Sequence, residues 1–161
     1  MSDIMKAFEF AKEKHKGQVD KSGKPYIFHP VRVSNGVETD SEKVVAILHD
    51  VLEDTDATVK DLLKIGVSLS EIDAVVLLTK EKNEPYMEYI KRLSKNDMAR
   101  HVKMSDLRHN MDMSRIENPT EKDYARLEKY KKAYNYLNSV EMEVLKEKGK
   151  YNGKEQDDIY L

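Results

Sequence analysis

The sequence has no cysteine, no long apolar run and no excess of one charge, and each absence excludes a class of protein. Without cysteine the chain forms no disulfide, thiolate zinc site, iron–sulfur cluster or cysteine nucleophile. The longest apolar runs, at 44–48 and 74–78, are five residues long, whereas a membrane helix needs about 20. Lysine and arginine number 28 against 30 acidic residues, a net charge of −2. No basic field is therefore present to attract nucleic acid or an anionic membrane.

The length of 161 residues suits one domain with an ordinary core. We expect this domain at 1–148 and a polar, frayed tail at 149–161. The first residues mix charged and apolar side chains and lack a signal-peptide core, and the absence of cysteine fits a reducing compartment. These features predict a cytoplasmic protein.

The helix signals of the sequence predict an all-α fold. No alternating strand pattern competes with them, and the Gly- and Pro-containing stretch at 19–30 is expected to be an ordered loop or a short hairpin. Capping residues and prolines mark helix starts at Ser2 or Asp3, after Pro30, at Thr39 or Asp40, and at Thr58, Ser70, Pro85, Asp97 and Thr120.

The most apolar of these helices, expected to run over 41–54, carries four polar groups: His49, Asp50, Glu53 and Asp54. Residues three and four apart share a helix face, so these groups cluster within two turns. Buried carboxylates without compensation cost much free energy, and a divalent cation would neutralise them. The alternative is a helix end whose acidic side chains face water.

Two further segments supply matching groups. His29 follows an apolar run, and Asp106 lies on another apolar-faced helix. Together with His49 and Asp50 they offer two nitrogen and two oxygen ligands, a set that suits manganese, iron, zinc or cobalt better than calcium. Each residue alone also has an ordinary explanation, such as a hydrogen bond from His29 to a carbonyl or an ion pair of Asp106 with a nearby cation.

The order of these groups resembles the HD superfamily of metal-dependent phosphohydrolases, and more narrowly the hydrolase domain of the RelA/SpoT family, which includes stand-alone small alarmone hydrolases. The similarity rests on the segments AFEFAKEKHKGQ, KSGKPYIFHP, AILHDVLEDT and KMSDLRHNM, and extends over about 7–113. It implies an HD-type helical bundle with one metal, usually manganese. It also implies hydrolysis of the 3′-diphosphate of ppGpp or pppGpp, which gives GDP or GTP and pyrophosphate and belongs to the stringent response.

The resemblance and the chemistry together assign roles to the remaining groups. Glu53 and Asp54 lie one turn beyond the ligands, where we expect general base or acid work on the attacking water and the leaving oxygen. Lys21 and Ser22 are expected to bind the distal phosphate, although Lys21 also fits a solvated loop lysine. Asn110 is expected to bind the ribose or a phosphate, as its counterpart does in the family.

Other polar and aromatic side chains receive no catalytic role. His15, His101 and His109 are expected to be structural or surface residues. The tyrosines of the last helix are expected to pack in the core or to form a contact between copies of the chain; they are Tyr124, Tyr130, Tyr134 and Tyr136.

Two departures from the family pattern leave the substrate open. Asp20 stands where the family usually has an arginine that packs against guanine, and Leu107 and Arg108 are exchanged relative to the family order. The metal-binding groups are all present. A hydrolase acting on another nucleotide, as a phosphatase or pyrophosphatase, therefore remains an alternative, and so does a non-catalytic nucleotide sensor.

Overall fold

The computed structural model describes residues 1–150, and in that range the all-helical prediction is confirmed. Extended pairing among these residues is limited to an isolated β-bridge between Val19 and Pro25. All but two residues of the predicted tail at 149–161 lie outside the described range. The elements are α1 (Asp3–Lys14), α2 (Phe28–Asn35), α3 (Asp40–Leu48), α4 (Val51–Asp54), α5 (Val59–Lys64), α6 (Leu69–Leu77), α7 (Tyr86–Leu93), α8 (Asp97–Asn110), the 3-10 helix η1 (Met113–Arg115) and α9 (Glu121–Glu147).

Side-chain caps fix where most helices begin. Thr39, Thr58 and Thr120 each form a capping box with the acidic residue three positions later, which satisfies two free backbone N–H groups at each helix start. The predicted cap at Ser70 is wrong: Ser68 makes this capping box, so α6 begins two residues earlier than Ser70 would allow.

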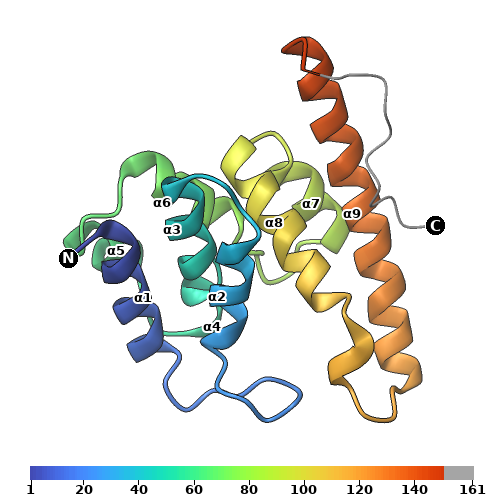
Figure 1. Cartoon of the computed structure of the whole chain (residues 1–161), viewed down its shortest axis with the longest axis horizontal. Coiled ribbons are helices and arrows are strands. Elements are labelled where there is room, and N and C mark those ends of the chain that lie inside the picture. Colours follow the sequence, from blue (N-terminus) through green and yellow to red (C-terminus); the bar gives the residue numbers. More distant parts are fainter. Residues whose placement is uncertain (151–161) are drawn as a thin grey trace.

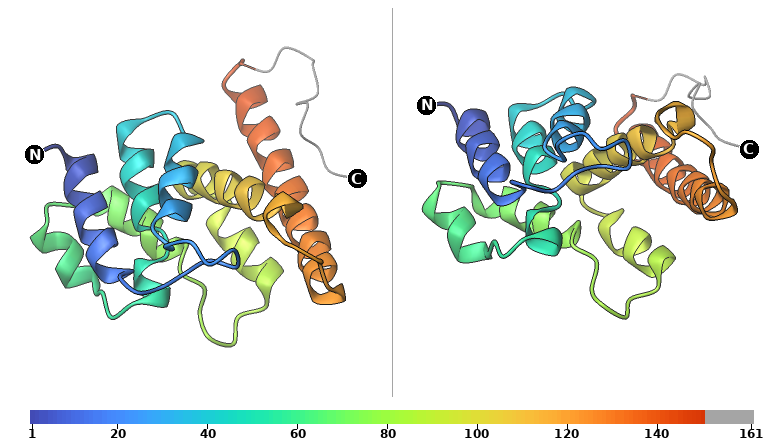
Figure 2. Two further views of the ribbon diagram at one scale, coloured as in Figure 1. Left: turned by 60° about the horizontal axis from the view of Figure 1, so that its bottom comes forward. Right: turned by 90° about the horizontal axis from the view of Figure 1, so that it is seen from below.

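Helix α3 is the centre of the bundle. It packs against α1, α2, α6 and α8, and its residues Val45 and Leu48 are completely buried. Helix α8 contacts α2, α3 and α6, and it also contacts α9, which lies on the side of the molecule remote from α1 (Figures 1 and 2). Helix α8 therefore joins the amino-terminal helices to α9. None of the helices in 1–150 combines the length and apolarity required to span a bilayer.

The continuous helix predicted over 41–54 is interrupted. Helix α3 ends at Leu48 and α4 begins at Val51, so His49 and Asp50 lie at the junction. The ring Nδ1 of His49 lies 2.6 Å from the carbonyl oxygen of Ala46, which the His49 backbone N–H also approaches. In a continuous helix this carbonyl would accept from Asp50 instead, so the histidine itself helps to end the helix.

The helix predicted after Pro30 begins earlier than expected. Because α2 starts at Phe28, His29 and Pro30 form part of its first turn. Pro30 is tolerated there because the first backbone N–H groups of a helix have no partner within it. This start fixes His29 on a helix rather than on a loop.

Candidate metal centre

Four side chains from three parts of the chain meet between α2, α3 and α8. Nε2 of His29 lies 2.9 Å from Oδ1 of Asp106, and Nε2 of His49 lies 3.0 Å from Oδ2 of Asp50. His49 Nε2 is also 3.5 Å from Asp106 Oδ1. His29, His49 and Asp106 are buried, and ligand atoms of His29, His49 and Asp50 all lie within 4.8 Å of one another. The structure thus brings together all four residues predicted as metal ligands.

The His49 ring is prepared to bind a cation. Its Nδ1 lies 2.6 Å from the Ala46 carbonyl oxygen, which can only accept, so Nδ1 carries the hydrogen of the neutral ring. Once the Nε2 proton has left, the lone pair of Nε2 points at the carboxylates of Asp50 and Asp106. Nε2 is buried and has no hydrogen-bond partner among residues 1–150. A buried acceptor facing two carboxylates fits a bound divalent metal, because the metal would bind the lone pair and neutralise the acids.

Neighbouring groups orient the two carboxylates. The Tyr26 hydroxyl donates a hydrogen bond to Oδ2 of Asp50. Nζ of Lys103 lies 2.9 Å from Oδ2 of Asp106, and the Asn110 amide donates to Oδ1 at 2.9 Å. Such outer contacts fix the direction of metal-ligating side chains. Asn110 therefore serves the candidate centre through Asp106.

The electrostatics of the free protein show how closely these groups are coupled. Burial alone would lower the pKa of His49, but the charges of Asp50 and Asp106 outweigh it and raise this pKa well above its usual range. Burial would raise the pKa of Asp106, but Lys103 together with His29 and His49 outweighs it and holds this pKa well below the ordinary value. A metal ion that binds here would therefore displace a proton from His49.

The two predicted acid–base residues lie in different surroundings. Oε1 of Glu53 accepts the backbone N–H of Lys80 at 2.9 Å, which fixes one carboxylate oxygen. Burial raises the pKa of Asp54 to about 6, and the charges of Asp50 and Glu53 add to this rise. A carboxyl group with this pKa can both take and give a proton near neutral pH. The structure therefore makes Asp54 the stronger candidate for proton transfer.

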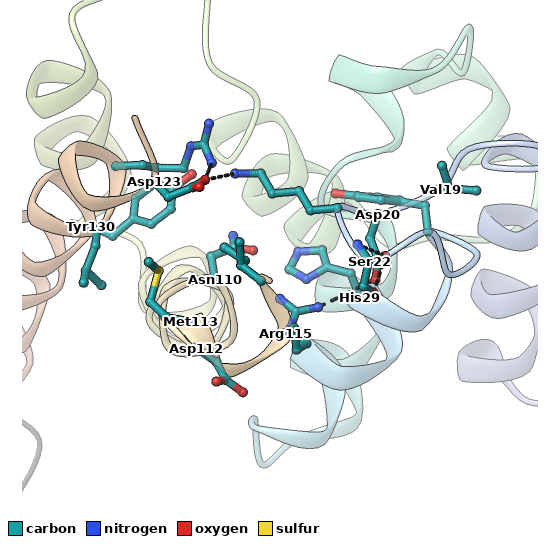
Figure 3. Close-up of a pocket in the computed structure, with 15 residues that line it drawn as sticks. Val19, Asp20, Ser22, His29, Asn110, Asp112, Met113, Arg115, Asp123 and Tyr130 are labelled. Atoms are coloured by element: carbon teal, nitrogen blue, oxygen red, sulfur yellow. Dashed lines mark hydrogen bonds and ion pairs between the residues drawn. The ribbon is translucent and has the colours of Figure 1, made fainter. Parts of the chain in front are cut away.

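A cavity of about 260 Å³ lies beside His29 and is referred to below as the substrate cavity. The three residues predicted to bind substrate, Lys21, Ser22 and Asn110, all line it. Figure 3 shows Ser22 and His29 on one side of the cavity and Asp123 and Tyr130 on the other. Nζ of Lys21 lies 3.3 Å from Oδ1 of Asp123, so Lys21 reaches across the cavity in the free protein, with 53 % of its side chain exposed.

Sequence reasoning assigned no site role to several residues that line the cavity: Tyr26, Arg115, Arg126 and Tyr130. Tyr26 lies only three residues before His29, which was a usable signal. Arg126 and Tyr130 are four residues apart on α9 and therefore share a face, but nothing in the sequence brings that face to His29.

Among the histidines outside the predicted ligands, His109 contacts a predicted ligand, His29, directly. Its ring stacks on His29 with centroids 4.9 Å apart, and the two Nδ1 atoms are 2.7 Å apart. Burial lowers the pKa of His109 to about 4, and the charges of His29, Arg115 and Arg32 contribute to this. The structural role expected for His109 is therefore support of His29.

The chain is similar in sequence to curated bacterial proteins. It is 35 % identical over 115 residues to the guanosine-3′,5′-bis(diphosphate) 3′-pyrophosphohydrolase of Aquifex aeolicus. It is also 34 % identical over 122 residues to the bifunctional (p)ppGpp synthase/hydrolase SpoT of Escherichia coli. These alignments cover 65 % and 67 % of this chain but only 16 % and 17 % of the relatives. The chain thus spans about a sixth of the length of these relatives. No family model matches the chain.

The fold is shared with a solved structure. A metazoan orthologue of SpoT, described as hydrolysing ppGpp and having a role in starvation responses, superposes with a TM-score of 0.72. The two are 22 % identical, and the match covers 93 % of this chain and 97 % of that one. The shared fold therefore includes nearly the whole chain.

Proposed function

Because this chain is homologous to the (p)ppGpp hydrolase domain of the RelA/SpoT proteins, we propose that it is a metal-dependent ppGpp and pppGpp 3′-pyrophosphohydrolase. The observation that carries the proposal is the convergence of two histidines and two aspartates on one buried point, where His49 Nε2 lies 3.0 Å from Asp50 Oδ2 and 3.5 Å from Asp106 Oδ1. Paired carboxylates beside that point supply what hydrolysis needs in addition to binding.

His29, His49, Asp50 and Asp106 are the residues that would hold the metal. Their mixed nitrogen and oxygen donors suit manganese, with other divalent transition metals as alternatives. When bound, such an ion polarises phosphoryl oxygens and lowers the pKa of water. Tyr26, Lys103 and Asn110 keep the carboxylates in place, as described above.

Proton transfer falls to Asp54, with Glu53 as the group that orients water. In the proposed reaction the oxygen of a water molecule bonds to the phosphorus attached to the ribose 3′-oxygen, and the bond between that phosphorus and the 3′-oxygen breaks. Asp54 takes a proton from the water and returns a proton to the 3′-oxygen, which leaves as a hydroxyl. Pyrophosphate departs with the oxygen of the water, and GDP or GTP remains.

Lys21, Ser22 and Asn110 are proposed to contact the phosphates and ribose. The exposed pair between Lys21 and Asp123 is weak enough to open, because ion pairs of this type contribute about 0–1 kcal/mol. A phosphate group can therefore replace Asp123 as the partner of Lys21.

The test is an assay of the purified protein, loaded with manganese, on ppGpp, pppGpp, GTP and a panel of deoxynucleoside monophosphates. We expect pyrophosphate release from the first two compounds and none from the others. His49→Ala and Asp106→Ala should lose both metal, by elemental analysis, and activity, whereas Asp112→Ala, a carboxylate on the cavity wall, should keep the metal. Full metal occupancy in either ligand variant would contradict the proposed centre.

One observation favours a second candidate function, hydrolysis of another nucleotide. Asp20 lines the substrate cavity and adds negative charge where a polyanion would bind. Phosphate or pyrophosphate release from a compound other than ppGpp and pppGpp, with neither of these consumed, would select this alternative.

A further inference from the structure

A second cavity, of about 580 Å³, adjoins the substrate cavity. The two cavities share three lining residues, Asp20, His29 and Arg115. The other residues that line each cavity differ. The shared side chains therefore form a common wall. The second cavity is further lined by Lys24, Phe28, Val31, Arg32, Asn35 and His109.

The charges of this second cavity are mostly positive and mostly unpaired. Lys24, Arg32 and Arg115 face a single carboxylate, that of Asp20. Within residues 1–150, neither Lys24 nor Arg32 has an ion-pair or hydrogen-bond partner for its side chain. Cations gathered in a concave site without counter-charges attract anions.

Arg115 is held loosely. Its Nη1 lies 3.7 Å from Oδ2 of Asp20, and its Nη2 lies 3.4 Å from the carbonyl oxygen of His109. Its Nε is buried and has no partner among the described residues. A guanidinium with a free donor on the wall between two cavities is suited to bind phosphate from either side.

Asp20 offsets only part of this charge, because it brings one carboxylate against three cations and that carboxylate also holds its own loop. Oδ1 accepts hydrogen bonds from the backbone N–H of Ser22 at 2.8 Å, from the Ser22 hydroxyl at 2.7 Å and from the Lys24 N–H at 3.0 Å. Only Oδ2 faces Arg115, at a longer distance. Asp20 thus shapes the loop that presents Lys24, and Arg115 keeps binding capacity.

We propose that this second cavity binds the phosphate chain of the nucleotide that is not cleaved, the 5′-diphosphate or 5′-triphosphate. This inference rests on the proposed function. A substrate with phosphate chains on both its 3′ and 5′ positions needs two anion sites, and the two cavities adjoin at Asp20, His29 and Arg115. The cations Lys24, Arg32 and Arg115 then select nucleotides by their 5′-phosphates.

The experiment compares three guanosine 3′-diphosphates that carry one, two or three phosphates at the 5′ position. Arg32→Ala should raise KM for the 5′-diphosphate and 5′-triphosphate about threefold to tenfold, the range of a partly exposed charged contact, and should raise it less for the 5′-monophosphate. Metal content and kcat should stay near those of the wild type, and Arg32→Lys should restore most of the affinity. Lys60→Ala on α5, which removes one cation but lines neither cavity, is the matched control. Equal changes in KM for all three substrates would overturn the inference.

Calorimetry separates this site from one that binds a second, separate nucleotide beside the exposed Phe28 ring. The Asp54→Asn variant should bind one ppGpp per chain. If Asp54→Asn binds two nucleotides per chain and Asp54→Asn/Arg32→Ala binds one, the second cavity holds a separate effector nucleotide. This result would overturn the inference.

Failure of the proposed function gives a different result. If the wild type released no pyrophosphate from any of the three nucleotides, that function would be refuted. The anion site would then be tested by measuring the affinity of the protein for inorganic tripolyphosphate. An affinity reduced about threefold to tenfold in Lys24→Ala/Arg32→Ala supports an anion site, and an unchanged affinity overturns it.

Discussion

At the scale of single residues, the chemistry of Asp54 depends on its acidic neighbours. Its carboxyl group lies near Asp50 and Glu53, and burial together with these charges raises its pKa to about 6. As a general base it must be ionised, so kcat should fall as the pH is lowered through about 6. Asp54→Asn should keep the metal and the fold and lower kcat about 10²–10⁴-fold, the usual contribution of such a group.

The matched variant for Asp54 is Glu53→Gln. It keeps an oxygen that can accept from the Lys80 N–H, so it should retain the structure and lower kcat. Because the Glu53 charge adds to the raised pKa of Asp54, the acid limb should move to lower pH in this variant. Loss of metal in either variant, by elemental analysis, would mean that these carboxylates are ligands and not proton carriers.

Asp20 has two opposite effects. Its negative charge repels a polyanionic substrate, and its Oδ1 accepts hydrogen bonds that hold its own loop in shape. From the sequence alone, replacement by arginine should improve binding of ppGpp. The structure changes this expectation, because arginine would remove the three hydrogen bonds that Oδ1 accepts. Asp20→Asn keeps an acceptor oxygen and removes the charge, so it should lower KM for ppGpp about threefold to tenfold with little change in kcat. Steady-state kinetics on Asp20→Asn and Asp20→Arg decide between the effects: a KM that falls only in Asp20→Arg would contradict the loop role.

At the scale of helices, His101 on α8 joins α3 to α9. One ring nitrogen contacts Glu42 of α3, and the other lies 2.8 Å from Oε2 of Glu141 of α9, which also lies 2.7 Å from Nε of Arg100. A histidine with both nitrogens bound to carboxylates carries its proton, and these contacts raise the pKa of His101, Glu141 most strongly.

The pH dependence of stability follows from this shift. His101 binds its proton more tightly in the folded chain than in the unfolded one. Its contribution is therefore fully present below about pH 6.5, the ordinary histidine value, and is lost as the pH rises through the higher folded-state pKa. In urea titrations of the chelated protein, the free energy of unfolding should fall over that interval, and His101→Gln should reduce the slope. An identical slope in the variant would exclude His101 as its origin.

The helix boundaries show which parts of the site the sequence could predict. The four clustered residues could be singled out from the sequence because polar groups in apolar segments are unusual and their order along the chain is specific. The break between α3 and α4 was not, because it depends on the contact of the His49 ring with the Ala46 carbonyl. Tyr130 was missed because only the packing of α9 on α8 brings its segment to the cavity. Arg115 was missed because it lies on η1, just beyond α8, where no motif marked it.

At the scale of the whole molecule, metal binding should contribute strongly to stability. Ligands that lie 77 positions apart in the chain, such as His29 and Asp106, meet only when the helices have assembled. A metal at 100 times its Kd stabilises the folded state by about 2.7 kcal/mol, and a domain of this size shifts Tm by about 2–4 °C for each kcal/mol. Chelation should therefore lower Tm by about 5–11 °C, measured by calorimetry, and manganese should restore it. The same treatment of His49→Ala should leave its Tm unchanged. A wild-type Tm that does not change when chelator is added would contradict the expected metal occupancy.

The ion pair between Lys21 and Asp123 connects the loop before α2 to the start of α9 across the substrate cavity. We call this pair the latch, because it must open before a phosphate group can bind Lys21. Ionic strength then acts on turnover in two opposite directions. Salt loosens the latch, and it also screens the attraction of a polyanion, with a Debye length of about 10 Å at 0.1 M. KM should therefore pass through a minimum as salt is increased. In Lys21→Met the latch is absent, and KM should only rise with salt; a minimum that persists in this variant would mean that another contact closes the opening.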